Sequence, residues 1–239
     1  MNQTQSSNPH PAALITGASR GLGLALATAL AKHGWELILD ARGRTALEDV
    51  QARLSRWTTV TAIAGDVSDA SHRQALALAA QQIGGLDAVI NNASQLGPSP
   101  MPALLDFPLE DLEGVYQVNI FGILGLLQEL KSSIKDGGRI INVTSDAGIE
   151  AYPGWGGYGS SKAALEQLSA ILAAENPQWR IYWVDPGDMR TQMHQEAFPG
   201  EDISDRPLPE ETVPGFIALL EGDLPSGRYR SKNLVAEEV

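Results

Sequence analysis

The chain has 239 residues, no cysteine and a formal net charge of −12 at pH 7. The length favours one α/β domain, and the absence of cysteine excludes disulfides, thiolate metal sites and a cysteine nucleophile. The acidic surplus argues against a nucleic-acid or anionic-membrane surface. No apolar run approaches the ~18 residues that span a bilayer. The scattered histidines show no metal-ligand spacing. We therefore expect no metal, no membrane contact and a cytoplasmic protein.

The predicted elements alternate along the chain between strands and helices. Residues 1–11 are polar and predict a flexible tail, followed by a single domain over residues 12–239. Continuously apolar runs predict strands at 12–16, 36–41, 60–66, 87–93, 139–145 and 180–186, with a weaker one at 227–231. Amphipathic stretches predict helices at 22–33, 45–56, 70–83, 109–131 and 158–175. This alternation predicts an α/β fold, a doubly wound Rossmann-type parallel sheet of about seven strands with helices on both faces.

The segment 192–212 differs from the rest of the chain because it is rich in proline and acidic residues and has few apolar positions. We expect a long loop that acts as a lid on the substrate side. The alternative is a disordered surface insertion.

The first predicted strand runs directly into the turn TGASRGLG, residues 16–23. Gly17, Gly21 and Gly23 let the backbone turn tightly and approach a pyrophosphate at the start of the following helix. Because this turn lies between a predicted strand and a predicted helix, it indicates dinucleotide binding. The alternative is an ordinary strand-to-helix corner that needs one or two glycines.

Three later residues form a chemically coherent set. Tyr158 and Lys162 lie four residues apart on one face of a predicted helix, and Ser145 ends a strand at the edge where open α/β sheets bind ligands. A neighbouring ammonium lowers the pKa of a phenol, so Tyr158 can exchange a proton with a carbonyl or alcohol oxygen near neutral pH. Ser145 can hydrogen-bond the same oxygen, and a nicotinamide would carry the hydride. The alternative is a surface tyrosine–lysine pair.

These motifs together resemble those of the short-chain dehydrogenase/reductase family, in the same order from about residue 12 to residue 191. The resemblance implies a catalytic tetrad of Asn119, Ser145, Tyr158 and Lys162, in which Asn119 holds a water that relays protons to Lys162. For Asn119 the alternative is a buried amide that caps a backbone group. The cofactor-binding residues that the resemblance implies are Gly17, Ser19, Arg20, Gly21, Leu22, Gly23, Ala41, Arg42, Asp66, Val67, Asn92, Ala93, Ser94 (where glycine is usual), Tyr158, Lys162, Pro186, Gly187, Met189 and Thr191.

The resemblance also suggests which cofactor is used. Family members that use NAD carry a carboxylate at the end of the second strand, and this position is Ala41 here. Asp40 is one residue earlier, so its side chain is expected to point to the other face and pair locally. Arg42 and Arg20 match the family's phosphate-binding bases. We therefore expect NADP(H), with carbonyl reduction as the favoured direction.

The substrate side is less well defined by the sequence. Gln95, Tyr152, Trp155, Met193 and Phe198 are the candidate substrate residues, and they favour a fairly apolar ketone or secondary alcohol as the small-molecule substrate. The family usually assembles through the helices at 109–131 and 158–175, so we expect a homodimer or homotetramer. The chain departs from the family's usual ending soon after residue 231, which counts against a tetramer that relies on C-terminal contacts.

The function that we expect is an NADP(H)-dependent oxidoreductase interconverting a carbonyl and a secondary alcohol, with the proton from Tyr158. Two alternatives remain open, a non-catalytic NADP(H)-sensing or scaffold protein on the same fold, and an enzyme that uses the same tetrad for elimination or epimerisation.

Overall fold

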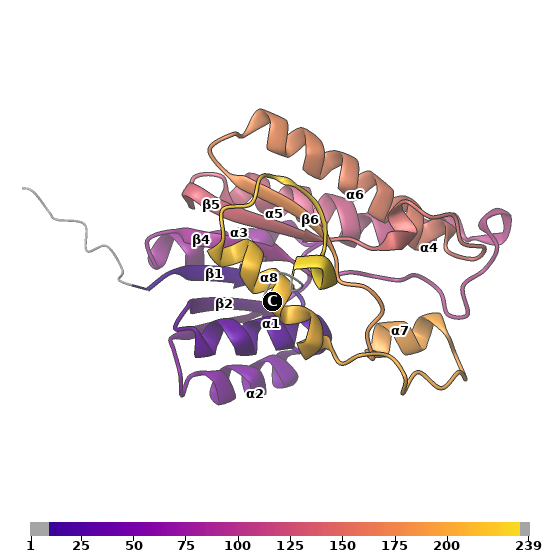
Figure 1. Cartoon of the computed structure of the whole chain (residues 1–239), viewed down its shortest axis with the longest axis horizontal. Coiled ribbons are helices and arrows are strands. Elements are labelled where there is room, and N and C mark those ends of the chain that lie inside the picture. The colour runs from indigo at the N-terminus through magenta and orange to yellow at the C-terminus, as the bar shows by residue number, and fades with distance from the viewer. Residues whose placement is uncertain (1–9, 235–239) are drawn as a thin grey trace, which may run out of the picture.

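The computed structural model describes residues 10–234 (Figure 1). Most of the predicted tail, residues 1–9, lies outside the described residues, as do residues 235–239. Within the described range, no helix is long and apolar enough to cross a membrane. The prediction of a single domain over residues 12–239 stays a prediction.

Within residues 10–234, seven strands form one parallel sheet in the order β3-β2-β1-β4-β5-β6-β7 (Figure 1). The strands are β1 (Ala12–Ile15), β2 (Glu36–Ala41), β3 (Val60–Ala64), β4 (Leu86–Asn91), β5 (Ile134–Val143), β6 (Arg180–Asp185) and β7 (Gly227–Arg230). Every predicted strand is present, including the weak last one. The chain moves outward from β1 to β3 and then returns to β4 beside β1, so the switch point of the sheet lies between β1 and β4.

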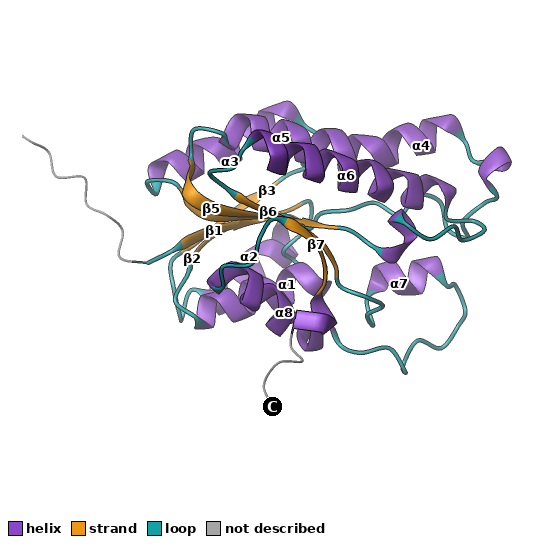
Figure 2. Ribbon diagram, turned by 45° about the horizontal axis from the view of Figure 1, so that its top comes forward, coloured by secondary structure: helices purple, strands orange, loops and turns teal. Residues whose placement is uncertain are grey.

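Helices cover both faces of this sheet (Figure 2). One face carries α1 (Gly21–Lys32), α2 (Arg44–Leu54) and α8 (Pro209–Glu221), and the other carries α3 (Ala70–Gln82), α4 (Leu109–Tyr116), α5 (Ile123–Leu130) and α6 (Gly156–Glu175). The short helix α7 (Gln192–Ala197) lies beyond the sheet (Figure 2). This arrangement confirms the predicted doubly wound α/β fold.

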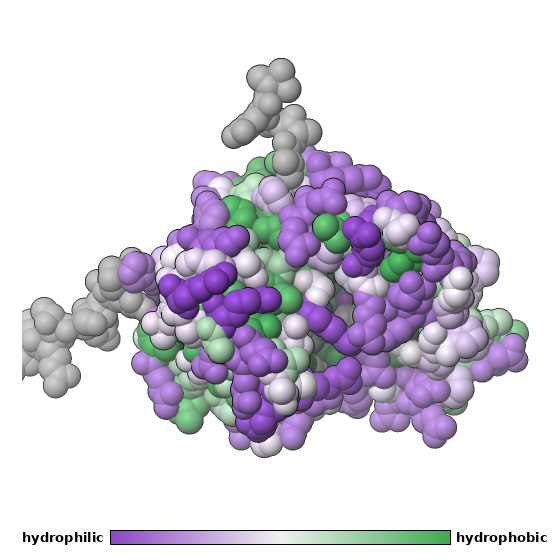
Figure 3. All heavy atoms as spheres, turned by 90° about the horizontal axis from the view of Figure 1, so that it is seen from below, coloured by the Kyte–Doolittle hydropathy of each residue, from purple (hydrophilic) through white to green (hydrophobic). Residues whose placement is uncertain are grey.

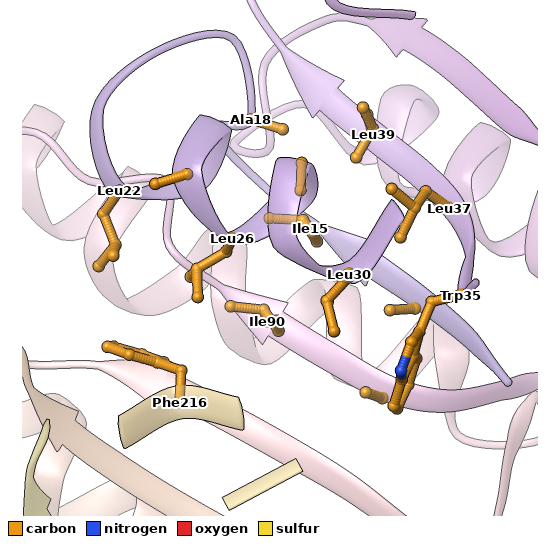
Figure 4. Packing of buried hydrophobic residues seen from close by; sticks show 14 of the residues in the cluster. Ile15, Ala18, Leu22, Leu26, Leu30, Trp35, Leu37, Leu39, Ile90 and Phe216 are labelled. Atoms are coloured by element: carbon orange, nitrogen blue, oxygen red, sulfur yellow. The ribbon is translucent and has the colours of Figure 1, made fainter. Parts of the chain in front are cut away.

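The alternation of side chains along β2 explains why three successive residues, Leu37–Leu39, are apolar. Leu37 and Leu39 belong to the buried hydrophobic cluster that also contains Leu26 and Leu30 of α1 and Phe216 of α8 (Figure 4). Ile38 points the other way and packs into the cluster under α3, α5 and α6. Both faces of the strand are therefore buried, as expected for a parallel sheet. The outer surface on the side of α1, α2 and α8 is mostly hydrophilic, with only small separate groups of hydrophobic residues (Figure 3).

The structure corrects two predicted elements. The helix predicted at 109–131 is interrupted by a π-helical turn at Gln117–Gly122, where a side chain on Gly122 would lie 2.6 Å from Val67. The segment 192–212 is not one long loop, because it begins with α7 and ends in the first turn of α8. The last proline and the last acids of the segment are helix-start features: Pro209 opens α8, and the Glu211 carboxylate accepts a 2.7 Å hydrogen bond from the Leu208 amide.

Candidate active site

A cleft of about 810 Å³ runs along the carboxyl ends of the strands. The predicted site residues that line it are Gly17, Ser19, Arg20, Gly21, Leu22, Ala41, Arg42, Asp66, Val67, Asn92, Ala93, Ser94, Gln95, Ser145, Trp155, Tyr158, Lys162, Pro186, Gly187, Met189, Thr191 and Met193. Four predicted residues do not line it, namely Gly23, Asn119, Tyr152 and Phe198. Most residues of the predicted site therefore lie along one continuous cleft, although they come from seven separate stretches of the chain.

The glycine turn forms one end of the cleft. Gly17 and Gly21 have φ angles of 67° and 54°, in the left-handed region that favours glycine. A side chain on Gly23 would lie 2.3 Å from the Gly17 carbonyl oxygen, which explains how a residue that does not line the cleft still shapes it. Helix α1 begins here without a side-chain cap, so its first amides remain available to an anion.

Hydrogen bonds from the end of β4 fix this turn. The Asn92 amide group donates to the carbonyl oxygens of Thr16, at 2.8 Å, and Gly17, at 3.2 Å. The Thr16 hydroxyl accepts from the backbone amides of Asn92 and Ala93, both at 3.0 Å. The two strands on either side of the switch point are thus tied together at the site where the chain turns.

Asp40 and Ala41 lie on opposite faces of β2, as predicted. The Asp40 carboxylate is buried and lies 2.6 Å from Nε2 of His72 on α3. Burial raises the pKa of Asp40, and the contact with His72 opposes that shift. Ala41 packs with the residues on the α1 side. Both residues reach the cleft, and the exposed Arg42 follows at its rim.

Ser145, Tyr158 and Lys162 form the other end of the cleft. Tyr158 and Lys162 are buried on the first turns of α6, with the Lys162 ammonium nitrogen 5.3 Å from the centre of the Tyr158 ring. That nitrogen donates a 2.9 Å hydrogen bond to the Val143 carbonyl oxygen at the end of β5. Ser145 follows two residues later, so the strand that holds the lysine also presents the serine.

The electrostatics of the pair differ from the prediction. Burial raises the pKa of Tyr158 above its ordinary value of 10.0, and burial lowers the pKa of Lys162 from 10.5 to about 7. We expected the ammonium to lower the pKa of the phenol, but loss of solvent is the largest cause of the shift in each group, and it raises the pKa of the phenol. The phenol is therefore protonated at neutral pH, which makes it a proton donor.

Asn119 lies in the π-helical turn behind the cleft. Its amide oxygen accepts from the Gln95 backbone amide at 2.8 Å and from the Ser94 hydroxyl at 3.2 Å. Its amide nitrogen donates to the Gln95 carbonyl at 3.0 Å and to the Ser161 hydroxyl at 2.9 Å. These contacts use both hydrogens and both acceptor positions of the side chain. The amide thus clamps the backbone of Gln95, as in the alternative interpretation, and its participation in a proton relay stays a prediction.

A charged network that the prediction missed supports the catalytic end. The Arg228 guanidinium on β7 donates to Glu166 of α6 at 3.0 and 3.1 Å and to the Ser145 carbonyl oxygen at 3.3 Å. Glu166 also accepts from the Thr144 hydroxyl at 2.9 Å. The spacing of Glu166, four residues after Lys162, is a sequence signal that could have indicated its place on the same helix face.

An aromatic wall closes the substrate side. The Trp155 ring centre lies 5.8 Å from that of Tyr158, 6.3 Å from that of Tyr152 and 5.9 Å from that of Phe198. Met193 of α7 packs against the same group. Phe198 and Tyr152 do not line the cleft themselves but support Trp155, which does.

Helix α7 is also tied to the glycine turn. The Arg20 guanidinium donates to the Gln192 side chain, whose amide nitrogen donates to Glu196 at 2.7 Å. The closure of segment 192–212 over a substrate stays a prediction. Across residues 10–234, no group of three or more acidic or histidine side chains is arranged to hold a metal ion.

A doubly wound parallel sheet with a glycine turn at its switch point is the architecture of the Rossmann-type dinucleotide-binding proteins. The chain belongs to one family among them: residues 11–202 match the profile of the short chain dehydrogenases. The protein is thus an oxidoreductase of this family, which acts on carbonyl and alcohol groups.

Three similar proteins illustrate the range of the family. A rhamnolipid-biosynthesis 3-oxoacyl-acyl-carrier-protein reductase of Pseudomonas aeruginosa is 37% identical over 171 residues, which are 68% of this chain and 66% of that protein. The benzil reductase of Saccharomyces cerevisiae, which forms (S)-benzoin, is 33% identical over 193 residues, covering 77% of this chain and 73% of that protein. The solved structure of a short chain dehydrogenase from Shigella flexneri complexed with NADP has a TM-score of 0.86 and 27% identity, covering 93% of this chain and 97% of that one.

Proposed function

We propose that the protein is an NADP(H)-dependent carbonyl reductase that converts a ketone to a secondary alcohol. The observation that carries this proposal is the buried Tyr158, protonated at neutral pH, beside Ser145 in a cleft whose other end is a glycine turn. At neutral pH this phenol carries its proton, which is the form that a general acid needs to protonate a carbonyl oxygen during reduction.

The residues at the nucleotide end fit a dinucleotide. The turn around Gly23 has no room for a side chain, and the uncapped start of α1 suits a pyrophosphate. The small Ala41 leaves space at the end of β2, and the Arg42 guanidinium beside it can pair with a 2′-phosphate. The Shigella flexneri relative, which is complexed with NADP, supports this choice of cofactor.

Each catalytic side chain has a defined task in this proposal. The Ser145 and Tyr158 hydroxyls hold the substrate oxygen, and Tyr158 donates its proton to that oxygen as negative charge develops there. Lys162 stabilises the phenolate that remains, because its nitrogen lies next to the ring. Bound NADP(H) supplies the hydride for this reaction.

The alternative of a non-catalytic sensor has less support. Lys162 is fully buried, and the structure of residues 10–234 gives it no carboxylate partner. Burial of an unpaired ammonium is costly, and its position beside the Tyr158 ring gives this lysine a use in proton transfer in addition to a contact with the cofactor.

The assembly belongs to the same proposal. Leu109 on α4, Phe121 in the π-helical turn and Ile171 on α6 are exposed apolar residues on the two helices predicted to form the interface. We expect a homo-oligomer, which light scattering would detect. A Phe121→Asp variant should shift it toward the monomer, whereas a wild-type protein that is already monomeric would contradict this expectation.

A panel of ketones and secondary alcohols, followed through NADPH absorbance, tests the function. We expect ketone-dependent consumption of NADPH and weaker turnover with NADH. If the purified protein binds NADPH but turns over no ketone or alcohol in either direction, the proposed function is wrong.

A further inference from the structure

Asp146, which the sequence analysis did not single out, places a carboxylate inside the catalytic end of the cleft. It follows Ser145 directly and lines the cleft with Ser145, Trp155 and Tyr158. One carboxylate oxygen accepts a 3.0 Å hydrogen bond from the Ser145 hydroxyl, and the other accepts a 3.2 Å hydrogen bond from the Tyr152 hydroxyl.

These two partners are neutral, which sets Asp146 apart from the other acids at this end of the cleft. Asp185 lies 3.2 Å from Arg230, and Asp188 lies 3.7 Å from Arg206. Across residues 10–234, no lysine, arginine or histidine lies within 4.0 Å of the Asp146 carboxylate. The site therefore presents a negative charge that the protein itself does not neutralise.

The surroundings of this carboxylate suit a cation. Trp155 and Tyr152 meet edge to face beside it, with ring centres 6.3 Å apart. Aromatic faces attract ammonium groups, and tryptophan does so most strongly. A carboxylate that lines the same cleft as a partly exposed tryptophan is thus a combination that favours a positively charged group and disfavours a negative one.

The hydrogen-bond pattern connects this charge to the reaction. The hydroxyl of Ser145 has a single hydrogen, and it donates this hydrogen to Asp146. A substrate group that donates to Asp146 competes for that oxygen and frees the Ser145 hydrogen for the carbonyl. The distance from the carbonyl oxygen through Ser145 to Asp146 corresponds to two hydrogen bonds, roughly 5–6 Å, which an amine two or three bonds from the carbonyl carbon can span.

We infer that the substrate is a ketone that carries a protonated amine, with the amine held by Asp146 beside Trp155. This inference rests on the proposed function, because it assigns a substrate class to the same cleft.

Three aryl ketones of nearly equal shape test this inference. β-(Dimethylamino)propiophenone is cationic at neutral pH, isopentyl phenyl ketone is neutral, and β-benzoylpropionate is anionic. We expect kcat/KM to fall in that order, with the cation preferred over the neutral ketone by roughly tenfold to a hundredfold, the range of one charge-assisted hydrogen bond. Asp146→Asn keeps the shape and should bring the ratio of cation to neutral ketone close to one.

Glu150→Gln is the matched control, because Glu150 is an exposed acid near Tyr152 that does not line the cleft. It should leave the ratio unchanged. If Asp146→Asn reduces turnover of all three ketones alike, calorimetry on the NADPH-saturated protein provides a second measurement. It compares the dissociation constants of the cationic and the neutral ketone. A wild-type ratio near one, or an unchanged ratio in Asp146→Asn by both measurements, overturns the inference.

The two proposals fail in different ways. If the protein reduces the neutral ketone and shows no preference for the amine, the proposed function stands and the inference of an amine-bearing substrate is wrong. Binding of the amine that depends on Asp146, without turnover of any ketone, supports the amine and contradicts the proposed function.

Discussion

Glycines, which have no side chain, shape the nucleotide end of the cleft, whereas buried polar side chains form the catalytic end. The first end is shaped by Gly17 and Gly21, whose positive φ angles favour glycine, and by Gly23, where an added carbon would collide with the Gly17 carbonyl group. The second is built from Tyr158 and Lys162, whose polar atoms are held away from solvent. The two ends are therefore sensitive to opposite changes. The nucleotide end is sensitive to an added methyl group, and the catalytic end is sensitive to the loss of a single polar atom.

The largest expected effect is at the catalytic end. Tyr158→Phe removes one oxygen and leaves the ring packed against Trp155, so the fold and NADPH binding should persist. Turnover should fall by about 10²–10⁴-fold, the usual contribution of a general acid. Steady-state kinetics with any accepted ketone measures this loss. Near-normal turnover would mean that another group supplies the proton.

At the nucleotide end, Gly23→Ala makes the opposite change. The new methyl group would lie 2.3 Å from the Gly17 carbonyl oxygen and 2.6 Å from the Asn92 amide nitrogen. We expect a loss of about 1–3 kcal/mol in stability from overpacking, and greatly weakened cofactor binding. Thermal unfolding and fluorescence titration with NADPH measure both quantities.

Gly43→Ala is the control for this steric effect, because its nearest neighbour would be the Ala46 side chain at 4.0 Å. Gly43 lines the same cleft, and the Gly43→Ala variant should bind NADPH almost normally. Equal behaviour of the two variants would show that space in the turn is not what matters.

Arg42 sharpens the comparison because it is a charged contact at the nucleotide end. Arg42→Ala should weaken NADPH more than NADH by about 1.5–3 kcal/mol, since only NADPH carries the 2′-phosphate. Ala41→Asp should shift the preference further toward NADH by repelling that phosphate. The ratio of the two dissociation constants, measured at one salt concentration, is the readout.

Asp40→Asn is the control for the cofactor preference, because it changes a residue next to Ala41 on the same strand. Because Asp40 pairs with His72 on the other face of β2, the substitution should leave the ratio almost unchanged even if stability falls. A larger change for Asp40→Asn than for Arg42→Ala would mean that Asp40 contacts the ribose and that NADP(H) is not the preferred cofactor.

The last expected effect is a dependence of stability on pH, and it comes from Lys162. Its pKa is about 7 in the folded protein and 10.5 as the ordinary value, so between these values the unfolded chain binds the proton and the folded chain does not. The free energy of unfolding should therefore rise with pH across this window, by at most about 1.4 kcal/mol per pH unit for one proton. Lys162→Met should remove this part of the slope in urea denaturation at several pH values. An identical slope in both proteins would show that burial does not shift the lysine.

Features formed by neighbours in the chain could be predicted. The seven strands appear as apolar runs, the glycine turn follows the first of them, and Tyr158 and Lys162 share a helix face through their spacing. Helix α8 was missed because its proline and acids resemble a loop, although Phe216 and Leu219 bury it against α1. Helix α8 depends on tertiary packing, because its first turn is polar and its apolar face is stabilised only by contact with other parts of the protein.

The chemistry of the site depends on residues that are distant in the chain. The order and spacing of residues along the chain were enough to predict the fold class and the glycine turn, and together with the family resemblance they identified the Ser145–Tyr158–Lys162 set. Only the tertiary structure decided that burial raises the pKa of Tyr158, that Asn119 clamps Gln95, and that Asp146 lies in the cleft without a cation. The physical reason is that desolvation and charge pairing depend on which groups folding brings together, and no spacing along the chain reports that.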